Sequence, residues 1–438
     1  MQLKRMKLLS VLSEALDCIE QEFLGVTNHH AKRVALLCDR MAEHLELSGE
    51  EKNAVFIGAL LHDSALNEHR EAYLSEVVPI SALKGHCIAG EDNLRLIPGV
   101  VSCNFVLYHH ENADGSGPFG KTAGQTPLGA QLIHIADQLD RCHPLSDPKQ
   151  APLHILREYI ERNRDTLFAS CVCDAMLHIL SEELLNALSD QCIEAVPTSI
   201  TDHPCQTDLR ALSALFARII DYKSPFTKNH SIGLAEKAER MAHYYHWDES
   251  TVEQLYCAGA LHDVGKLMVD RDVLEKPGKL DKKEYQHIQS HAYETFRLLS
   301  KLEGLEAITH WASRHHEKLN GTGYPFGLSA SQLDEKSRLL ACLDIYQALT
   351  EDRPYKAGMS HAKAMSILQE LAEKGELDCE ITKDIGRVFH CEERTDDEMP
   401  KALFQCPVCG HIYTGDTMPQ RYDCPVCGQP ETAFRRLR

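Results

Sequence analysis

Residues 255–266 read LYCAGALHDVGK, an uncharged and mostly apolar run that ends in a histidine, an aspartate and a lysine. Such a run is typical of a buried helix. Neighbouring residues on a helix point about 100° apart, so His262 and Asp263 fit one metal ion poorly. A carboxylate that lies between two metals would use this divergence well. The stretch therefore predicts a helical fold with a metal centre at the end of a buried helix.

More histidines and another aspartate surround this stretch. Imidazole and carboxylate groups are ligands for borderline metals such as iron, manganese and zinc. Seven candidate ligands exceed the three or four of one tetrahedral catalytic site, and they suit two metals about 3.5–4 Å apart with open positions for water. The candidate metal ligands in the second half of the chain are His230, His262, Asp263, His291, His315, His316 and Asp344.

The first half of the chain repeats this order of residues. GALLHD (58–63) resembles GALHD (259–263), and YHHENADGSGPF (108–119) resembles RHHEKLNGTGYPF (314–326). Because the candidate ligands repeat together with their apolar flanks, we predict a duplicated metal-binding domain. The candidate metal ligands in the first half are His30, His62, Asp63, His86, His109, His110 and Asp137.

Length and composition set further limits. With 438 residues the chain is expected to form two or three domains. The net charge of -19 disfavours binding to nucleic-acid polymers or anionic membranes, because an acidic surface repels phosphates. We find neither a signal peptide nor an uncharged apolar stretch of membrane-spanning length, and so expect a cytoplasmic protein without a membrane partner. Thirteen of the seventeen cysteines are scattered, which favours buried, reduced thiols.

The pattern of apolar residues is helical nearly throughout, as at Val34, Leu37 and Met41. We therefore predict an all-α protein of two tandem helical domains, followed by a small module held together by metal. The predicted boundaries are 1–195 for the first domain, 196–206 for a linker with turn-forming residues, 207–396 for the second domain, and 400–438 for the C-terminal module.

HDVGK (262–266) together with HHEKLNGTGYP (315–325) resembles the HD-GYP subclass of the HD-domain metal-dependent phosphohydrolases, over about residues 207–395. The resemblance implies an all-helical fold and hydrolysis of cyclic di-GMP to pGpG or GMP by a hydroxide that two metals, iron or manganese, activate. It also implies that the seven candidate ligands form the metal site and that Asp263 bridges the metals.

The resemblance also assigns residues that act on the substrate. Lys266 matches a lysine that protonates the leaving oxygen or holds a phosphate, so Asp263 and Lys266 are the expected catalytic residues. Arg353 and Lys356 match cations that hold the substrate phosphates, where a guanidinium and an ammonium group suit anions. The expected substrate-binding residues are Arg353, Lys356, Gly321 and Tyr324.

Three positions in the second half depart from the family pattern. Phe226 replaces a glutamate that supports a third metal in some members, so we expect two metals. Asn320 replaces the usual aspartate of the signature loop. Gln347 replaces the usual aspartate three residues after the last ligand. The last two changes bear on the substrate more than on metal binding.

The first half keeps every ligand type, but Leu66 stands where the second half has Lys266. A leucine can neither deliver a proton nor hold a phosphate. No counterpart of the RPYK segment follows Asp137. Three interpretations stay open: a metal-bound regulatory domain of weak activity, a second active phosphohydrolase site with another substrate, or a structural relic that binds metal incidentally.

Two pairs of cysteines near the C-terminus have the spacing of a metal site. Cys406 and Cys409 form one pair, Cys424 and Cys427 the other, and a glycine follows each pair. Four thiolates bind iron or zinc tetrahedrally, and in so short a segment the metal would stabilise the fold. The segment resembles the rubredoxin-like tail of rubrerythrins, which implies one redox-active iron. A zinc ribbon is the alternative.

Together these features predict a metal-dependent cyclic dinucleotide phosphodiesterase, with redox control by the C-terminal iron as a hypothesis. The rival functions are a nucleotide-sensing or redox-sensing scaffold without turnover, and a phosphohydrolase for another nucleotide, such as a mixed cyclic dinucleotide or a phosphomonoester. An electron-transfer partner and a homodimer are compatible with the sequence.

Overall fold

The computed structural model describes residues 5–69, 78–98, 100, 103–193, 207–223, 229–276, 278–352, 357–390, 403–405, 412–414, 430 and 435–436. These residues belong to two compact units. One contains Leu16–Asp202 and Asp396–Arg438, and we call it the first unit. The other contains Met1–Ala15 and His203–Thr395, and we call it the second unit. The predicted linker, residues 196–206, lies outside the described residues.

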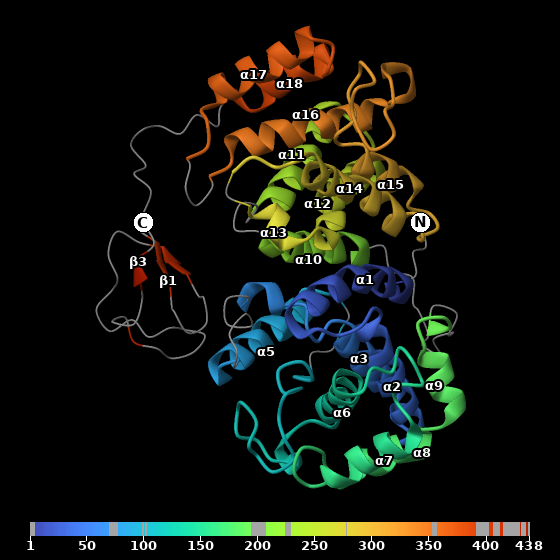
Figure 1. Ribbon diagram of the computed structural model, residues 1–438. Coiled ribbons are helices and arrows are strands. Elements are labelled where there is room, and N and C mark those ends of the chain that lie inside the picture. Colours follow the sequence, from blue (N-terminus) through green and yellow to red (C-terminus); the bar gives the residue numbers. More distant parts are fainter. Residues whose placement is uncertain are drawn as a thin grey trace. The chain divides into compact units, whose positions relative to one another are not determined.

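Helices form nearly all of the regular structure in the described residues (Figure 1). The prediction of an all-α protein is therefore confirmed. The first helix, α1 (Arg5–Leu24), crosses the division between the two units at residue 15. The other elements of the first unit up to residue 193 are α2 (His30–His44), α3 (Gly49–Leu60), η1 (Leu66–His69), α5 (Ile80–Arg95), η2 (Ala123–Gln125), α6 (Leu128–Cys142), α7 (Leu153–Arg162), α8 (Ser170–Ile179) and α9 (Glu182–Leu188).

The second unit repeats this order of helices. The elements of the second unit from residue 207 onward are α10 (Thr207–Lys223), α11 (His230–Tyr244), α12 (Glu249–Leu261), η4 (Val264–Met268), α13 (Arg271–Leu274), α14 (Lys282–Leu299), α15 (Glu306–Ser313), η5 (Ala330–Gln332), α16 (Glu335–Thr350), α17 (His361–Glu373) and α18 (Cys379–Val388). Helices α2, α3, α5 and α6 correspond to α11, α12, α14 and α16, because each pair carries the same candidate ligands.

The predicted apolar faces are buried. Val34, Leu37 and Met41 on α2 are fully buried, as are Leu234 and Met241 on α11. In the first unit α2 packs against α3 and α6, and in the second α11 packs against α12 and α16. This packing brings the start of α2 or α11 next to the helix that carries the last aspartate ligand.

In both units a carboxylate on the preceding helix holds the start of the helix that begins with the first histidine. Asp17 accepts hydrogen bonds from the backbone N–H groups of His29 (3.0 Å) and Ala31 (3.2 Å). Asp221 accepts one from the backbone N–H of Ser231 (3.1 Å). Free N–H groups at a helix start favour such an acceptor. The contact fixes where His30 and His230 lie.

The C-terminal module contributes three short strands: β1 (Leu403–Gln405), β2 (Ile412–Thr414) and β3 (Arg435–Arg436). They form an antiparallel sheet in the order β2-β1-β3, with Phe404 opposite Tyr413 and Arg436. Its four cysteines, Cys406, Cys409, Cys424 and Cys427, lie outside the described residues, so their metal site stays a prediction.

No helix among the described residues is long and apolar enough to cross a membrane. The described cysteines are all free thiols, but the prediction that they are buried holds only in part: Cys38, Cys257 and Cys342 are buried, whereas Cys171 and Cys192 are exposed.

Candidate metal centres

The structure brings the seven candidate ligands of the second unit together. They come from the start of α11, the end of α12, the middle of α14, the turn after α15 and the middle of α16. Two groups of potential ligand atoms form, one from His230, His262 and Asp344 and the other from His291, His315 and His316, and a third group of His262, Asp263 and His315 joins them.

Asp263 lies between these two groups. Its Oδ2 is 3.0 Å from His262 Nε2, and its Oδ1 is 3.3 Å from His291 Nε2 and 3.8 Å from His315 Nε2. Each carboxylate oxygen thus faces a different set of imidazoles. This is the divergence expected of neighbouring residues at a helix end.

Backbone carbonyl groups fix the orientation of the histidine rings. Nδ1 of His262, His291 and His315 donates to the carbonyl oxygen three residues earlier, at 2.7, 2.6 and 2.6 Å. A neutral ring that donates from Nδ1 keeps its lone pair on Nε2. The Nε2 atoms of His291 and His315 nevertheless lie 3.2 Å apart. Two lone pairs at this distance repel each other unless a cation lies between or beside them.

The donor set therefore fits divalent metal ions. His262 Nε2 and Asp263 Oδ1 are buried and make no hydrogen bond to any described residue, which is costly unless another partner binds them. Burial also lowers the pKa of His291 to about 3 and that of His316 to about 4, so both rings are neutral ligands near pH 7. Nitrogen and carboxylate donors in these numbers suit iron, manganese or zinc.

Lys266 lies beside the carboxylate of Asp263. Its Nζ is 2.5 Å from Asp263 Oδ2, one turn earlier in the chain. Burial alone would lower the pKa of Lys266, but the charge of Asp263 outweighs burial and raises it. The lysine is therefore protonated near pH 7 and can donate a proton or bind an anion.

A residue that the sequence analysis missed orients the first ligand. His230 Nδ1 is 3.0 Å from Glu351 Oε2, and His230 Nε2 is 3.1 Å from Asp344 Oδ1. Burial opposes the charging of His230, but these two carboxylates outweigh it and raise the pKa of His230 to about 10. Gln347 Nε2 also donates to Glu351 Oε2, at 3.2 Å. Glu351 thus supplies, one turn later, a carboxylate that Gln347 lacks.

The signature loop is held by another missed residue, Glu317. Its two carboxylate oxygens accept the backbone N–H groups of Phe326 (2.7 Å) and Leu328 (2.8 Å). A side chain at Gly323 would collide with the backbone at Glu317. The ring of Tyr324 lies 4.7 Å from that of His316. The sequence signal was visible, since a glutamate follows the histidine pair in both halves of the chain.

Two other residues singled out from this loop have structural roles. Gly321 has a φ of +76°, a left-handed conformation that favours glycine. Asn320 Oδ1 accepts from Thr322 N (3.1 Å) and Thr322 Oγ1 (2.7 Å), so it closes the turn. Arg353 and Lys356, and Phe226 at the position of the third-metal glutamate, lie outside the described residues.

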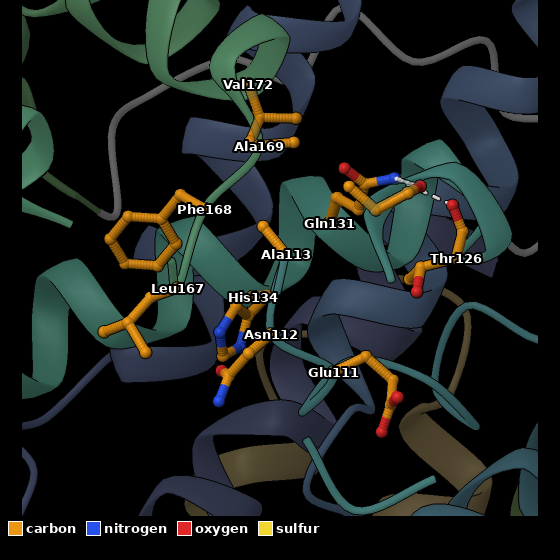
Figure 2. Close-up of a pocket in the computed structure, with 11 residues that line it drawn as sticks. Glu111, Asn112, Ala113, Thr126, Gln131, His134, Leu167, Phe168, Ala169 and Val172 are labelled. Atoms are coloured by element: carbon orange, nitrogen blue, oxygen red, sulfur yellow. Dashed lines mark hydrogen bonds between the residues drawn. The ribbon is translucent and has the colours of Figure 1, made fainter. Parts of the chain in front are cut away.

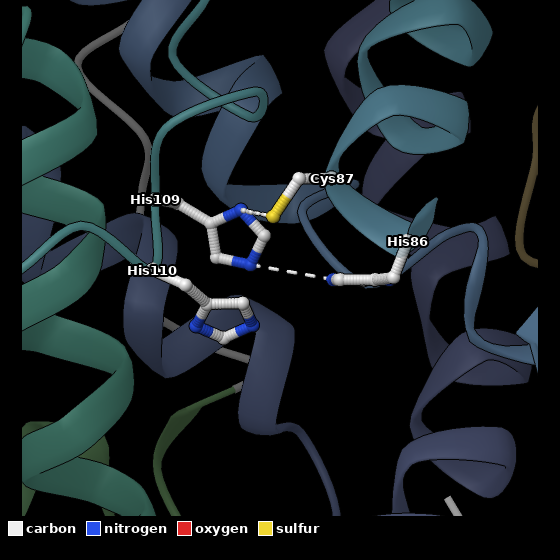
Figure 3. Close-up of side chains that lie close together, drawn as sticks. All are labelled: His86, Cys87, His109 and His110. Atoms are coloured by element: carbon white, nitrogen blue, oxygen red, sulfur yellow. Dashed lines mark hydrogen bonds between the residues drawn. The ribbon is translucent and has the colours of Figure 1, made fainter. Parts of the chain in front are cut away.

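The first unit assembles its candidate ligands in the same way. Asp63 Oδ1 is 2.9 Å from His86 Nε2, and Asp63 Oδ2 is 3.5 Å from His62 Nε2. His30 Nε2 is 3.2 Å from Asp137 Oδ1. Figure 3 shows His86 and His109 facing each other, with their Nε2 atoms 3.4 Å apart.

The rest of that cluster differs in detail from the second unit. His110 lies beside His109, and Cys87 approaches the far side of the His109 ring, where Sγ is 3.8 Å from Nδ1 (Figure 3). The second unit has Ala292 at the position of Cys87. Asp140, three residues after the last ligand, contacts His30 Nδ1 at 2.7 Å. The first unit therefore keeps the carboxylate that Glu351 replaces in the second.

Family models match three parts of the chain. Residues 27–142 and 214–381 each match an HD domain, and residues 404–435 match the rubredoxin-like domain of rubrerythrin. Both HD matches contain the ligands of one unit, and the third match contains the four C-terminal cysteines. HD domains and the rubredoxin-like domain each imply bound metal.

Curated relatives align over much of the chain. The 3′3′-cGAMP-specific phosphodiesterase 1 of Vibrio cholerae is 31% identical over 395 residues, which cover 86% of this chain and 91% of that protein. The 3′3′-cGAMP-specific phosphodiesterase 3 of the same organism is 38% identical over 317 residues, 68% of this chain and 64% of the relative. A cyclic di-GMP phosphodiesterase of Pseudomonas aeruginosa is 30% identical over 205 residues, 46% of this chain and 50% of that protein.

A solved structure shares the fold. The crystal structure of a cyclic GMP-AMP-specific phosphodiesterase of Vibrio cholerae matches with a TM-score of 0.61 at 22% identity, and the match covers 89% of this chain and 98% of that one. The chain thus belongs to the HD-GYP family of HD-domain metal-dependent phosphohydrolases, with two HD domains in tandem and a rubredoxin-like domain.

Proposed function

We propose that the second HD domain hydrolyses a phosphodiester bond of a cyclic dinucleotide. The observation that carries this proposal is the position of Asp263, whose two oxygens face separate histidine groups while Lys266 contacts the same carboxylate. This arrangement fits a binuclear centre with a proton donor at its edge. The names of the relatives support a cyclic dinucleotide as the substrate class.

The protein groups have distinct roles in the proposed reaction. When bound, two divalent cations supply an activated water and neutralise the charge of the phosphodiester. Asp263 and the histidines hold these cations, and His230 is kept in place by Glu351. Lys266, protonated near pH 7, gives its proton to the departing 3′ oxygen or holds a phosphate oxygen. Arg353 and Lys356 hold the phosphates.

Two substrates are candidates. The sequence motifs favour cyclic di-GMP, which would yield pGpG and then GMP. The relatives that align over most of the chain are named for 3′3′-cGAMP, which makes this mixed dinucleotide the second candidate. The signature loop supports binding of a base or ribose, because the Tyr324 ring lies next to His316 at the edge of the ligand cluster.

We further propose that the C-terminal module binds one iron through Cys406, Cys409, Cys424 and Cys427 and influences the enzyme by its redox state. Four thiolates hold iron in ferrous and ferric states, and an iron pair in the second HD domain would respond to electron supply. Zinc in the same cysteine site would remove this control.

The test is anaerobic turnover of cyclic di-GMP and 3′3′-cGAMP by full-length protein loaded with ferrous iron or manganese. Lys266→Ala and Asp263→Ala are expected to lose turnover, and Asp63→Ala, the matching change in the first unit, is expected to keep it. A wild-type protein that binds metal but cleaves neither substrate would contradict the proposal. Loss of turnover only in Asp63→Ala would move the reaction to the first unit.

A further inference from the structure

The first unit contains a pocket that reaches its candidate metal ligands. The pocket has a volume of about 390 Å³, and both Asp63 and His110 line it. Small-molecule sites in proteins measure about 300–1,000 Å³, so this pocket is at the small end of that range. Its volume would accommodate a ligand of roughly mononucleotide size.

A cationic side chain, Arg141, is among the residues that line this pocket. Arg141, which lines it, stands on α6 one helical turn after the last ligand, and its Nη1 is 3.5 Å from Asp137 Oδ2. The Arg141 side chain is 31% exposed, whereas that of Asp137 is 1% exposed. The guanidinium group therefore reaches from the buried ligand cluster to the open pocket.

Arg141 has no counterpart in the second unit, where the same position of α16 is Ala348. The second unit instead carries Lys266 on the bridging aspartate, and the first unit has Leu66 there. Among the described residues, Arg141 thus contacts the last aspartate ligand of the first unit, whereas Lys266 contacts Asp263 in the second. Arginine binds phosphate oxygens in a bidentate manner, whereas lysine acts as a point charge that can release a proton.

Part of the lining of the pocket is apolar. Leu24, Leu66, Leu83 and Leu167 contribute to it. Ile80, which also lines the pocket, is 61% exposed and offers a further apolar surface. One ligand could place an anionic group at Arg141 and an uncharged, flat or apolar group against these apolar side chains.

Further polar groups also line the pocket. Asn112, Ser116 and Gln138 line the pocket. His134 lines it as well and is 5% exposed; neither of its ring nitrogens makes a hydrogen bond to the described residues. The same side chain borders a cavity of about 10 Å³ (Figure 2), too small for more than one water. A buried imidazole in this state is a ready partner for a ligand hydroxyl group or a bound water.

We propose that the first HD domain binds a small phosphate monoester of mononucleotide size. Its phosphate would lie between Arg141 and the metal-ligand cluster, and its organic part against the apolar side chains of the lining. In a chain with a net charge of -19, an anion binds only where local cations offset the surrounding field. Arg141 and the metal ions that the ligand cluster would hold are such cations. This proposal concerns binding in the first unit and does not depend on turnover in the second.

The test is calorimetric titration of GMP into full-length, manganese-loaded protein. Arg141→Ala is expected to weaken the binding of GMP to one site about 10-fold to 100-fold, because a charge-assisted hydrogen bond is lost. Guanosine, which lacks the phosphate, is expected to bind weakly to all forms. Arg162→Ala, which removes an exposed arginine of α7, is the matched control and should bind GMP as the wild type does.

Ser116→Asp is a second variant with little risk to the fold, since Ser116 is exposed and lines the pocket. Its added negative charge should also weaken GMP binding. Absence of GMP binding by the metal-loaded wild type would overturn the proposal. Wild-type affinity in both Arg141→Ala and Ser116→Asp would overturn it as well, because GMP would then bind elsewhere.

Discussion

Glu351 offers a direct test of how the ligand cluster of the second unit is held. Its Oε2 is 3.0 Å from His230 Nδ1, and the two side chains are 8% and 5% exposed. Replacing Glu351 with alanine removes a buried, charge-assisted partner of a metal ligand. Loss of such a partner costs about 10-fold to 100-fold in metal affinity or activity, or roughly 1.4–2.8 kcal/mol. This agrees with about 1.5–3 kcal/mol for a hydrogen bond to a charged group.

The first unit suggests a rescue. Asp140, three residues after the last ligand, holds His30 Nδ1 at 2.7 Å, and Gln347 occupies the equivalent position in the second unit. We therefore expect Gln347→Asp to restore metal affinity to the Glu351→Ala variant, because the new carboxylate would reach His230 from the same helical position.

The assay is competition for manganese between the protein and a chromophoric chelator, together with kcat/KM for the cyclic dinucleotide. Glu370→Ala on α17 is the control, since Glu370 forms an exposed pair with Lys374 (2.7 Å). Wild-type manganese affinity in Glu351→Ala would refute the reasoning. A double variant that stays as weak as Glu351→Ala would refute the equivalence of the two positions.

Three other predictions follow from the sites. Lys266→Ala should lower kcat about 10²-fold to 10⁴-fold while the bound metal, measured by elemental analysis, stays at the wild-type level; a parallel loss of metal would assign the lysine a structural role. After metal is removed with a chelator, the protein should lose thermal stability as the pH falls from about 6.5 toward 4. The pKa values of His291 and His316 are lowered in the folded chain, so in this range the unfolded chain binds protons at these rings that the folded chain does not bind. A melting temperature that is constant over this range would contradict this. Cys409→Ser should lower the iron content of the C-terminal module and abolish any difference in turnover between air and reductant, and an unchanged redox response would exclude control through this iron.

The direction of the pH effect follows from which histidines shift. His230, with a pKa raised to about 10, and His62, with a pKa raised to about 9, contribute stability that is complete below about pH 6.5. Their contribution therefore does not change in the tested window. The buried rings with lowered pKa values, His291 and His316, lose theirs in that window. Metal bound to the same rings is expected to shift the loss to lower pH, because protons must then displace the metal.

Much of the metal centre could be predicted from the sequence. His262 and Asp263 lie at the end of an apolar run, and their side chains there have few functions other than metal binding. Their repetition as His62 and Asp63 argues against chance. The lysine at position 266 followed from the same motif. These inferences need only the identity and spacing of residues, because ligand chemistry is a property of the side chain itself.

The supporting residues could not be predicted in the same way. Asp140 lies three residues after the candidate ligand Asp137, and Glu351 lies seven residues after the candidate ligand Asp344. Both positions fall on the helix face that carries the ligand. The two halves of the chain place this carboxylate at different spacings from the ligand, and the family pattern drew attention to Gln347 instead. Only the packing of α11 against α16 decides which carboxylate reaches His230.

The same division holds for the pocket of the first unit. The sequence by itself determined that Leu66 replaces the lysine, and hence that this unit lacks the ammonium group that the second unit has there. The tertiary structure decided that Arg141 brings another cation to the cluster, because the reach of its side chain from α6 and the open space beside Asp63 depend on how the helices pack. Which side chains can bind a metal follows from the type of each residue. The direction and surroundings of a side chain, in contrast, depend on how helices distant in the sequence pack together.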